Sequence, residues 1–218
     1  VKPLLKAKGY DLQIVEFTDY VTPNIAVNEG ELDANFFQHL PYLEEFNKNK
    51  NTDLVKTVNV HLEPMGLYSN KIKDIKQLEN GATIAVPNDP TNESRALDIL
   101  VKEGLLTFKD VDFKTVVDIT ENPKNLKIKE LDAPQLPRVL DEVDAAIINT
   151  NYALSANLNP LKDAIIIESK DSPYANIVVV KKGNENKDSI KALNEAINSE
   201  EIRTFIKEKY QGSIVEAF

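Results

Sequence analysis

Short apolar segments alternate with segments of helical periodicity along most of the chain. Residues 82–86 (ATIAV) and 145–149 (AAIIN) are nearly continuous apolar runs, which are typical of strands buried on both faces. Residues 12–17 (LQIVEF) alternate between apolar and polar side chains, as a strand does. Between such runs the apolar positions recur at helical spacing, for example within residues 96–101. This alternation predicts an α/β protein with largely parallel sheets.

Capping residues and glycines mark the ends of several predicted helices. Pro23 follows Thr22 at the start of one helix, and Gly30 ends it. A second helix begins after a run of capping residues, 88–92, and ends near Gly104. The predicted strands are residues 12–17, 32–37, 82–86, 126–131, 145–149, 165–168 and 175–181, with a long extended stretch at 54–69. The predicted helices are residues 1–8, 22–30, 41–47, 74–78, 90–104, 134–140, 152–158 and one or two helices within 189–210.

The first residues of the sequence have the features of a helix C-terminus. Residues 1–8 (VKPLLKAK) are interpreted as the end of a helix that stops at Gly9. We therefore expect further sequence ahead of residue 1. No signal peptide or lipidation motif is recognisable in the sequence itself.

Composition excludes several classes of protein. The 218 residues suffice for one large domain or two small lobes, and 42% of them are hydrophobic. No apolar run approaches the roughly 20 residues that a membrane-spanning helix needs. A formal charge of −9 repels nucleic acid. There are no cysteines, so disulfides, thiol catalysis and cysteine-ligated metals are excluded.

Aromatic residues gather just after a predicted strand. Phe37, His39 and Tyr42 lie where α/β sheets place ligands, at a strand end and in the loop beyond it. The alternative is structural, with Phe36 and Phe37 in the core and His39 as a surface imidazole whose hydrogen bonds are satisfied. His39 and His61 are the only histidines, and without cysteines they do not predict a metal site.

An anion site is predicted where residues 87–92 (PNDPTN) lead from a strand into a helix. The free N–H groups and the dipole of a helix N-terminus attract anions, and Arg95 lies one turn further along. Because the chain has only three arginines, one at this place points to a carboxylate clamp. Ordinary N-capping with a solvated arginine is the alternative.

Two asparagines occur at ends of apolar strands. Asn149 directly follows the apolar residues 145–148. Asn176 lies at the start of the apolar run that continues to residue 181. An amide both donates and accepts hydrogen bonds, so the two could bind the ammonium and carboxylate groups of a zwitterion. A structural role for each is the alternative. No nucleophile elbow, phosphate loop or dinucleotide-binding glycine pattern is present, so neither catalysis nor a cofactor is expected.

At these segments the chain resembles the methionine-binding lipoproteins of ABC importers, the NlpA family. The resemblance runs in register over essentially the whole chain. The matching strings are residues 19–21 (DYV) with Pro23 and Asn24, 33–35 (DAN), 37–39 (FQH) with Tyr42, 85–92 (AVPNDPTN) with Arg95, 121–126 (ENPKNL), 133–138 (APQLPR), 148–150 (INT) and 172–174 (SPY).

The resemblance implies a two-lobed periplasmic-binding-protein fold of type II-like architecture. Its sheets would be mixed and mainly parallel, with helices on both faces, and the ligand cleft would lie between lobes that close like a hinge. We expect one lobe to contain residues 1–76 plus 174–218 and the other residues 77–173. Family members have a lipobox cysteine and a first strand ahead of the first helix, so we expect both to precede this sequence.

The family's ligand contacts fall on matching positions of this chain. Tyr20, Phe37, His39 and Tyr42 would surround the methionine side chain. Arg95 would hold the α-carboxylate, and Asn149 and Asn176 would bond the backbone of the amino acid. The list of expected binding residues is therefore Tyr20, Phe37, His39, Tyr42, Arg95, Asn149 and Asn176, with no catalytic residue and no metal ligand.

The function implied by the resemblance is delivery of methionine to an ABC importer. The protein would be extracytoplasmic, lipid-anchored to the cell membrane, and partnered by a permease and an ATPase. L-methionine, D-methionine and a methionyl dipeptide all fit, and His61 and Asn151 belong to either the site or the scaffold.

Two rival functions come from other classes. One is a small-molecule enzyme on the same fold, such as a prephenate-dehydratase-like domain. Porphobilinogen deaminase is excluded because it needs a cofactor-bearing cysteine. The other is the ligand-sensing domain of a regulator, although no DNA-binding segment is visible.

Overall fold

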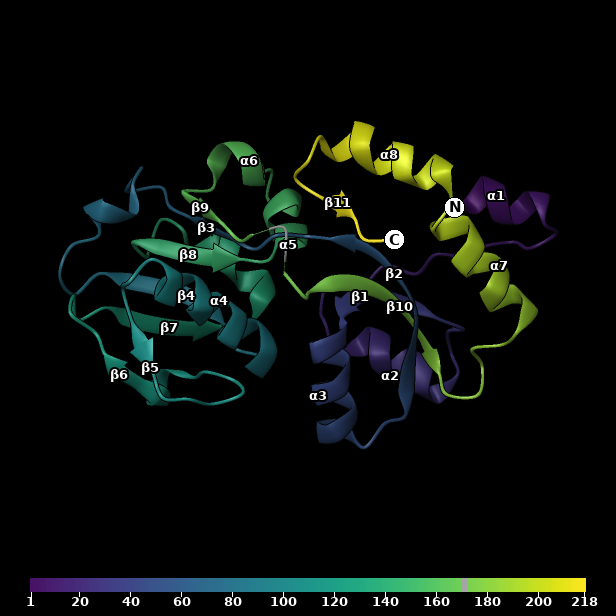
Figure 1. Cartoon of the computed structure of the whole chain (residues 1–218), viewed down its shortest axis with the longest axis horizontal. Coiled ribbons are helices and arrows are strands. Elements are labelled where there is room, and N and C mark those ends of the chain that lie inside the picture. The colour runs from purple at the N-terminus through teal and green to yellow at the C-terminus, as the bar shows by residue number, and fades with distance from the viewer. Residues whose placement is uncertain (170–171) are drawn as a thin grey trace. The chain divides into compact units, whose positions relative to one another are not determined.

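The chain folds into two compact units (Figure 1). The computed structural model describes residues 1–169 and 172–218. Unit 1 consists of Val1–Glu63 and Asp171–Phe218, and unit 2 of Pro64–Lys170. The expected boundary between residues 76 and 77 is wrong, since unit 2 begins at Pro64. The reason is that β3 (Gly66–Tyr68) pairs with β8 (Ala145–Ile148) and β9 (Ile166–Ile167) of unit 2.

Unit 1 is built on a four-stranded sheet. Its strand order is β1 (Asn35–His39), β10 (Ala175–Lys181), β2 (Leu54–Leu62) and β11 (Val215–Glu216). Every pair in this order is antiparallel. The register places Asn176 opposite His39 on one side and His61 on the other. Residues from three distant segments therefore form one row across the sheet.

Helices cover both faces of this sheet. Ile177 and Val178 of β10 point to opposite faces because strand side chains alternate. Ile177 packs with Val27 and Leu43, while Val178 packs with Ile197. The helices of unit 1 are α1 (Lys2–Ala7), α2 (Thr22–Glu29), α3 (Leu40–Lys50), α7 (Asp188–Ile197) and α8 (Glu200–Tyr210). The near-continuous apolar character of β10 follows from this double burial.

Residues 12–17 do not form the strand that their alternation predicts. The structure has no strand there, and Ile14 and Val15 are 68% and 55% exposed. Alternation specifies only a side-chain pattern, whereas a strand also needs a neighbour for its N–H and C=O groups. No described strand supplies that ladder. This prediction is therefore wrong for the structure described.

Unit 2 contains a five-stranded mixed sheet and a small hairpin. The order in the sheet is β7 (Lys127–Leu131), β4 (Thr83–Pro87), β8, β3 and β9, and the hairpin joins β5 (Thr107–Phe108) to β6 (Ile119–Glu121). The described parallel pairs are β4 with β7 and β4 with β8. The expected predominance of parallel pairing is wrong, because strands that alternate with helices along the chain need not run parallel in the sheet, and β3 pairs antiparallel with both of its neighbours.

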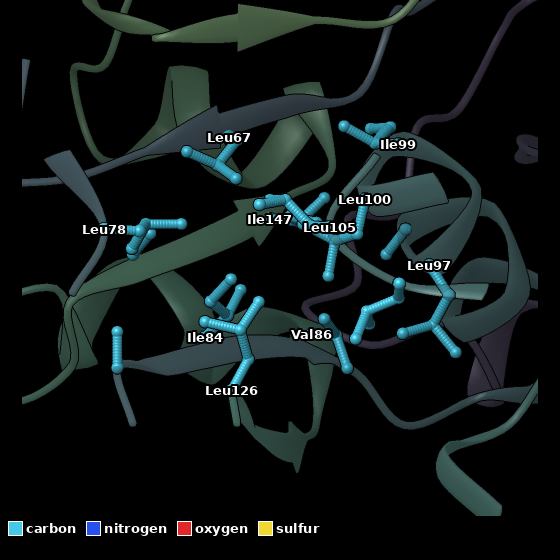
Figure 2. Close-up of a cluster of buried hydrophobic side chains, with 14 of the residues drawn as sticks. Leu67, Leu78, Ile84, Val86, Leu97, Ile99, Leu100, Leu105, Leu126 and Ile147 are labelled. Atoms are coloured by element: carbon cyan, nitrogen blue, oxygen red, sulfur yellow. The ribbon is translucent and has the colours of Figure 1, made fainter. Parts of the chain in front are cut away.

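The core of unit 2 joins helix α4 (Pro90–Lys102) to one face of the sheet. Figure 2 shows Leu97 and Leu100 of this helix with Ile84 and Ile147 of the central strands. All four side chains are fully buried. The remaining helices are η1 (Ile75–Gln77), η2 (Val116–Asp118), η3 (Ala133–Val139), α5 (Thr150–Ser155) and α6 (Pro160–Asp163). Helix α4 is thus held firmly along its length, which matters because its first turns carry candidate site residues.

The helix predicted at residues 134–140 is present as a 3-10 helix. It is η3, with Pro137 inside it. A proline within a helix has no N–H to donate and its ring crowds the preceding turn, so it opposes regular α-helical bonding. Leu136 of this segment still reaches the core, on the face of the sheet opposite to α4. In the part of the chain described, no helix is long and apolar enough to cross a membrane.

Candidate functional site

Five aromatic rings of unit 1 form what we call the aromatic cluster. Tyr20 stacks on Phe37 with ring centroids 5.8 Å apart, and Tyr42 lies edge-on to each of them at 6.0 Å. His39 lies edge-on to Tyr42 at 6.3 Å and to Tyr174 at 4.9 Å. The structure therefore brings together all four residues that the resemblance places around the side chain of the ligand. Tyr174 joins them, although its importance was visible in the sequence only as part of a motif string.

Hydrogen bonds fix the cluster where β1 leads into α3. His39 is the N-cap of α3, and its Nδ1 accepts from the N–H of Tyr42 at 3.2 Å. The Tyr42 hydroxyl donates to the carbonyl oxygen of Tyr20 at 2.8 Å. His39 is only 4% exposed, so the alternative of a surface imidazole is wrong. Tyr20, Phe37 and Tyr42 are half-buried.

A buried network of amides supports the same region. Asn24 and Gln38 exchange two hydrogen bonds, of 2.9 and 2.6 Å, and Asn35 donates to Asn24 at 2.9 Å. These side chains tie α2 to β1, and all three are buried. Because each amide is both donor and acceptor, the network satisfies itself without solvent. It holds the turn that carries Tyr20 against the strand that carries Phe37.

The turn itself is closed by a carboxylate. Asp19 Oδ1 accepts from the N–H groups of Val21 and Thr22 at 2.8 and 2.7 Å. Burial alone would raise the pKa of Asp19, but the hydrogen bonds from Thr22 and Val21 outweigh it and hold that pKa below its usual range. Asp19 is therefore charged at neutral pH and fixes the backbone next to Tyr20.

Asn176 lies beside a histidine whose role the sequence left open. The Nδ2 of Asn176 is 3.4 Å from Nε2 of His61. This His61 nitrogen is in turn 2.7 Å from Oε1 of Glu63. His61 also packs edge-on against the ring of Phe36 at 5.1 Å. The structure therefore places His61 next to a predicted site residue, in the row that also contains His39.

In unit 2, Arg95 is buried against a carboxylate. Its Nε lies 3.0 and 3.1 Å from the two oxygens of Glu168, and its Nη2 lies 2.5 Å from Oε2. The two side chains are 4% and 5% exposed. The alternative of a solvated arginine is therefore wrong. Glu168 was missed as a site residue, and its sequence signal is weak: a single acid that ends the apolar run 165–167.

Asn149 begins a chain of hydrogen bonds that ends at the cap of α4. Its Nδ2 donates to Asn92 Oδ1 at 3.0 Å, and Asn92 Nδ2 donates to both oxygens of Asp89 at 3.0 Å. Asp89 is the N-cap of α4, as the capping interpretation predicted, and burial raises its pKa. Asn149 Oδ1 is buried and has no hydrogen-bond partner among the described residues. An acceptor placed in this way suits an incoming N–H donor.

A second buried acid on α4 titrates near neutrality. Burial raises the pKa of Glu93 from 4.5 to about 7, with Glu130 and Asp89 adding to the shift and the N–H of Val116 opposing it. The folded state therefore holds this proton more tightly than the unfolded chain does. The stability that the proton supplies is complete below the ordinary pKa and is lost as the pH rises to about 7.

We expect the substitution Glu93→Gln to remove this loss of stability. Between about pH 4.5 and 7.5, the free energy of unfolding of the parent should fall relative to that of the variant by about 2–3 kcal/mol. Urea denaturation at a series of pH values measures it. Glu142→Gln, whose side chain is 69% exposed, is the control and should follow the parent. Parallel pH curves for the parent and Glu93→Gln would show that the acid is not coupled to folding.

The predicted residues thus form two groups, one in each unit. Unit 1 holds the aromatic cluster and Asn176, and unit 2 holds Arg95 and Asn149.

At the level of fold, the chain is similar to solved substrate-binding proteins. It matches a nutrient binding protein from Burkholderia cenocepacia bound to methionine, with 48% identity, a TM-score of 0.96, and coverage of 99% of this chain and 91% of the other. It matches an ABC transporter periplasmic substrate-binding protein from Coxiella burnetii with 44% identity, a TM-score of 0.95 and coverage of 99% and 92%.

The chain belongs to the NlpA lipoprotein family, whose model matches residues 1–218. It is 47% identical over 210 residues to the probable D-methionine-binding lipoprotein MetQ of Vibrio cholerae, covering 95% of this chain and 78% of that protein. It is 44% identical over 214 residues to the D-methionine-binding lipoprotein MetQ of Escherichia coli K12, covering 96% and 79%. The resemblance found in the sequence is confirmed. These relatives are named as binding proteins and not as enzymes, which favours a binding function over the enzymatic alternative.

Proposed function

We propose that this protein binds methionine and delivers it to an ABC importer. The observation that carries the proposal is the match of the whole chain to a protein solved with methionine bound, at 48% identity and a TM-score of 0.96. The residues that the proposal needs are present and ordered within each unit: an aromatic cluster in one, and a buried arginine and an unsatisfied buried amide oxygen in the other.

The aromatic cluster suits the side chain of methionine. The rings of Tyr20, Phe37 and Tyr42 pack against one another, and His39 lies edge-on to Tyr42. A polarisable thioether gains about 0.3–1.5 kcal/mol from each aromatic contact. Several such contacts in addition to apolar burial favour a thioether over a charged or strongly polar side chain.

The polar residues suit the zwitterionic end of an amino acid. We assign the α-carboxylate to Arg95, whose guanidinium has more than one edge for bonding and engages Glu168 through its Nε and Nη2. Asn149 Oδ1 is an acceptor suited to the ammonium group, and Asn176 adds a second amide. Both charged groups of the zwitterion thereby gain hydrogen-bond partners, as burial requires.

Calorimetric titration with a panel of ligands tests this function. Methionine should bind with the highest affinity, and leucine should bind detectably but more weakly. The expected difference is about 1–3 kcal/mol, because a hydrophobic pocket discriminates only modestly between side chains of similar size. Including both enantiomers and glycylmethionine identifies the form of methionine preferred. Equal affinities for methionine, leucine and glutamate would contradict the proposal.

Transport and anchoring are the remaining parts of the proposal. We assign the protein to the extracytoplasmic side of the membrane, held by an N-terminal lipid and partnered by a permease and an ATPase. Its membership of a lipoprotein family and its similarity to an ABC transporter substrate-binding protein support this assignment. Expression of the complete gene in a bacterium that lacks its own methionine-binding lipoprotein should restore methionine uptake. Unchanged uptake despite correct localisation would contradict it.

A further inference from the structure

Glu168 makes three separate attachments inside unit 2. Its Oε1 accepts a hydrogen bond from Nε of Arg95, and its Oε2 accepts one from Nη2 of Arg95. Oε2 also accepts from the backbone N–H of Met65 at 3.1 Å. Glu168 is 8% exposed and Met65 is fully buried. A carboxylate bonded side-on to a guanidinium and to a backbone amide cannot rotate without breaking a buried charge-assisted bond. The geometry of Arg95 is therefore tied to the main chain through Glu168.

The main chain at this place is itself held. Met65 and Pro64 are the first residues of unit 2, and the carbonyl oxygen of Pro64 accepts from the Thr150 hydroxyl at 2.5 Å. Thr150 directly follows Asn149, the other proposed ligand residue of this unit. Glu168 stands just after β9, which pairs with β3. Two independent buried hydrogen bonds therefore connect the site residues to one backbone segment, Pro64–Met65. Arg95 is connected through Glu168, and Asn149 through its neighbour Thr150.

Charge also decides what Arg95 can contribute. A buried guanidinium with no counter-ion would attract any small anion, and a flexible one would turn toward water. Paired with Glu168, Arg95 adds little net charge to its surroundings but keeps N–H donors in one fixed direction. Recognition of a carboxylate by such a pair depends on direction and not on excess positive charge.

We propose that Glu168 is a positioning residue for ligand recognition, holding Arg95 in the orientation that receives the α-carboxylate of the amino acid. The inference rests on the proposed function and deepens it at the same site. It predicts that Glu168 matters only for ligands that have a carboxylate, and only while Arg95 is present.

The test compares methionine with methioninol, which keeps the side chain and the ammonium group but lacks the carboxylate. Calorimetry on the parent protein should show a strong preference for methionine. In Glu168→Gln, methionine affinity should fall by about tenfold to a hundredfold, the usual range for a hydrogen bond to a charged group, while methioninol affinity stays within about threefold. Glu168→Asp, which keeps the charge on a shorter side chain, should recover part of the preference and serves also if Glu168→Gln does not fold.

Two further variants separate positioning from other roles. Glu142→Gln removes the same charge from an exposed side chain of unit 2 and should leave both affinities unchanged. In an Arg95→Ala background, Glu168→Gln should have no further effect on methionine binding. A further loss in that background would show that Glu168 does not act through Arg95.

The remaining outcomes are equally decisive. A Glu168→Gln variant that loses affinity for both ligands in the same proportion would show a structural role only. A variant that binds methionine as tightly as the parent would show that Glu168 has no role in binding, and one that binds more tightly would show that Glu168 competes with the ligand for Arg95. Each of these results overturns the inference and leaves the proposed function intact. A parent protein that does not bind methionine would overturn the proposed function itself.

Discussion

Replacing Arg95 by alanine is expected to weaken methionine binding by about 2–5 kcal/mol, because it leaves the buried carboxylate of the ligand without a charged partner. The side chain of Arg95 is 4% exposed, so solvent does little to screen its interactions. The same substitution strands Glu168 in the interior, and the protein should also lose about 3–5 kcal/mol of stability. Binding must therefore be measured where circular dichroism shows the variant to be folded.

Two matched variants make the result specific. Arg95→Lys should recover only part of the affinity, because a lysine keeps the charge but cannot bond two oxygens side-on. Arg138→Ala removes an exposed arginine of η3 and should change little. Titration calorimetry on all three decides the matter. If folded Arg95→Ala binds methionine within about twofold of the parent, the carboxylate is held elsewhere.

Truncating Leu100 should lower the stability of the protein strongly without touching the candidate site. This side chain is fully buried between α4 and the sheet of unit 2 (Figure 2). Leu100→Ala is expected to lower the free energy of unfolding by about 2–5 kcal/mol, through lost apolar burial and the cavity that remains. Urea denaturation monitored by circular dichroism measures it. Val117→Ala, at a side chain that is 77% exposed, should stay within about 0.5 kcal/mol of the parent. Equal losses in the two variants would mean that α4 is not packed as described.

The positions of most elements were predictable because each has a local cause. The apolar run 175–181 predicts β10 with its observed bounds, and Gly30 ends α2 in the left-handed conformation expected of a closing glycine. Strand direction and the boundary of unit 2 had no local cause. They depend on which strands meet, and β3 joins unit 2 through partners about a hundred residues away in the chain. Residues 12–17 failed for the same reason, since alternation does not supply a neighbouring strand.

The candidate site divides in a similar way. Tyr20, Phe37, His39 and Tyr42 occur in distinctive motif strings, and the structure places their rings together. Their contacts with a ligand remain a prediction. Glu168 could not be found by the same reasoning, because its importance comes from Arg95 and Met65, which are 73 and 103 residues distant in sequence. A single acidic residue after an apolar strand is not recognisable in the sequence as a site residue, because its partners come near only in the folded sheet.

The strand order of unit 1 has a consequence for the order of folding. β1 and β2 are neighbours in sequence but not in the sheet, because β10 lies between them and pairs with both. The pairing of Asn176 with His61 closes a loop of 115 residues, and such long-range pairings form slowly. Unit 2, a continuous stretch from Pro64 to Lys170, is synthesised before β10. The N-terminal segment has no central strand until residues 175–181 are synthesised, so the edges of β1 and β2 are open to wrong partners for most of translation.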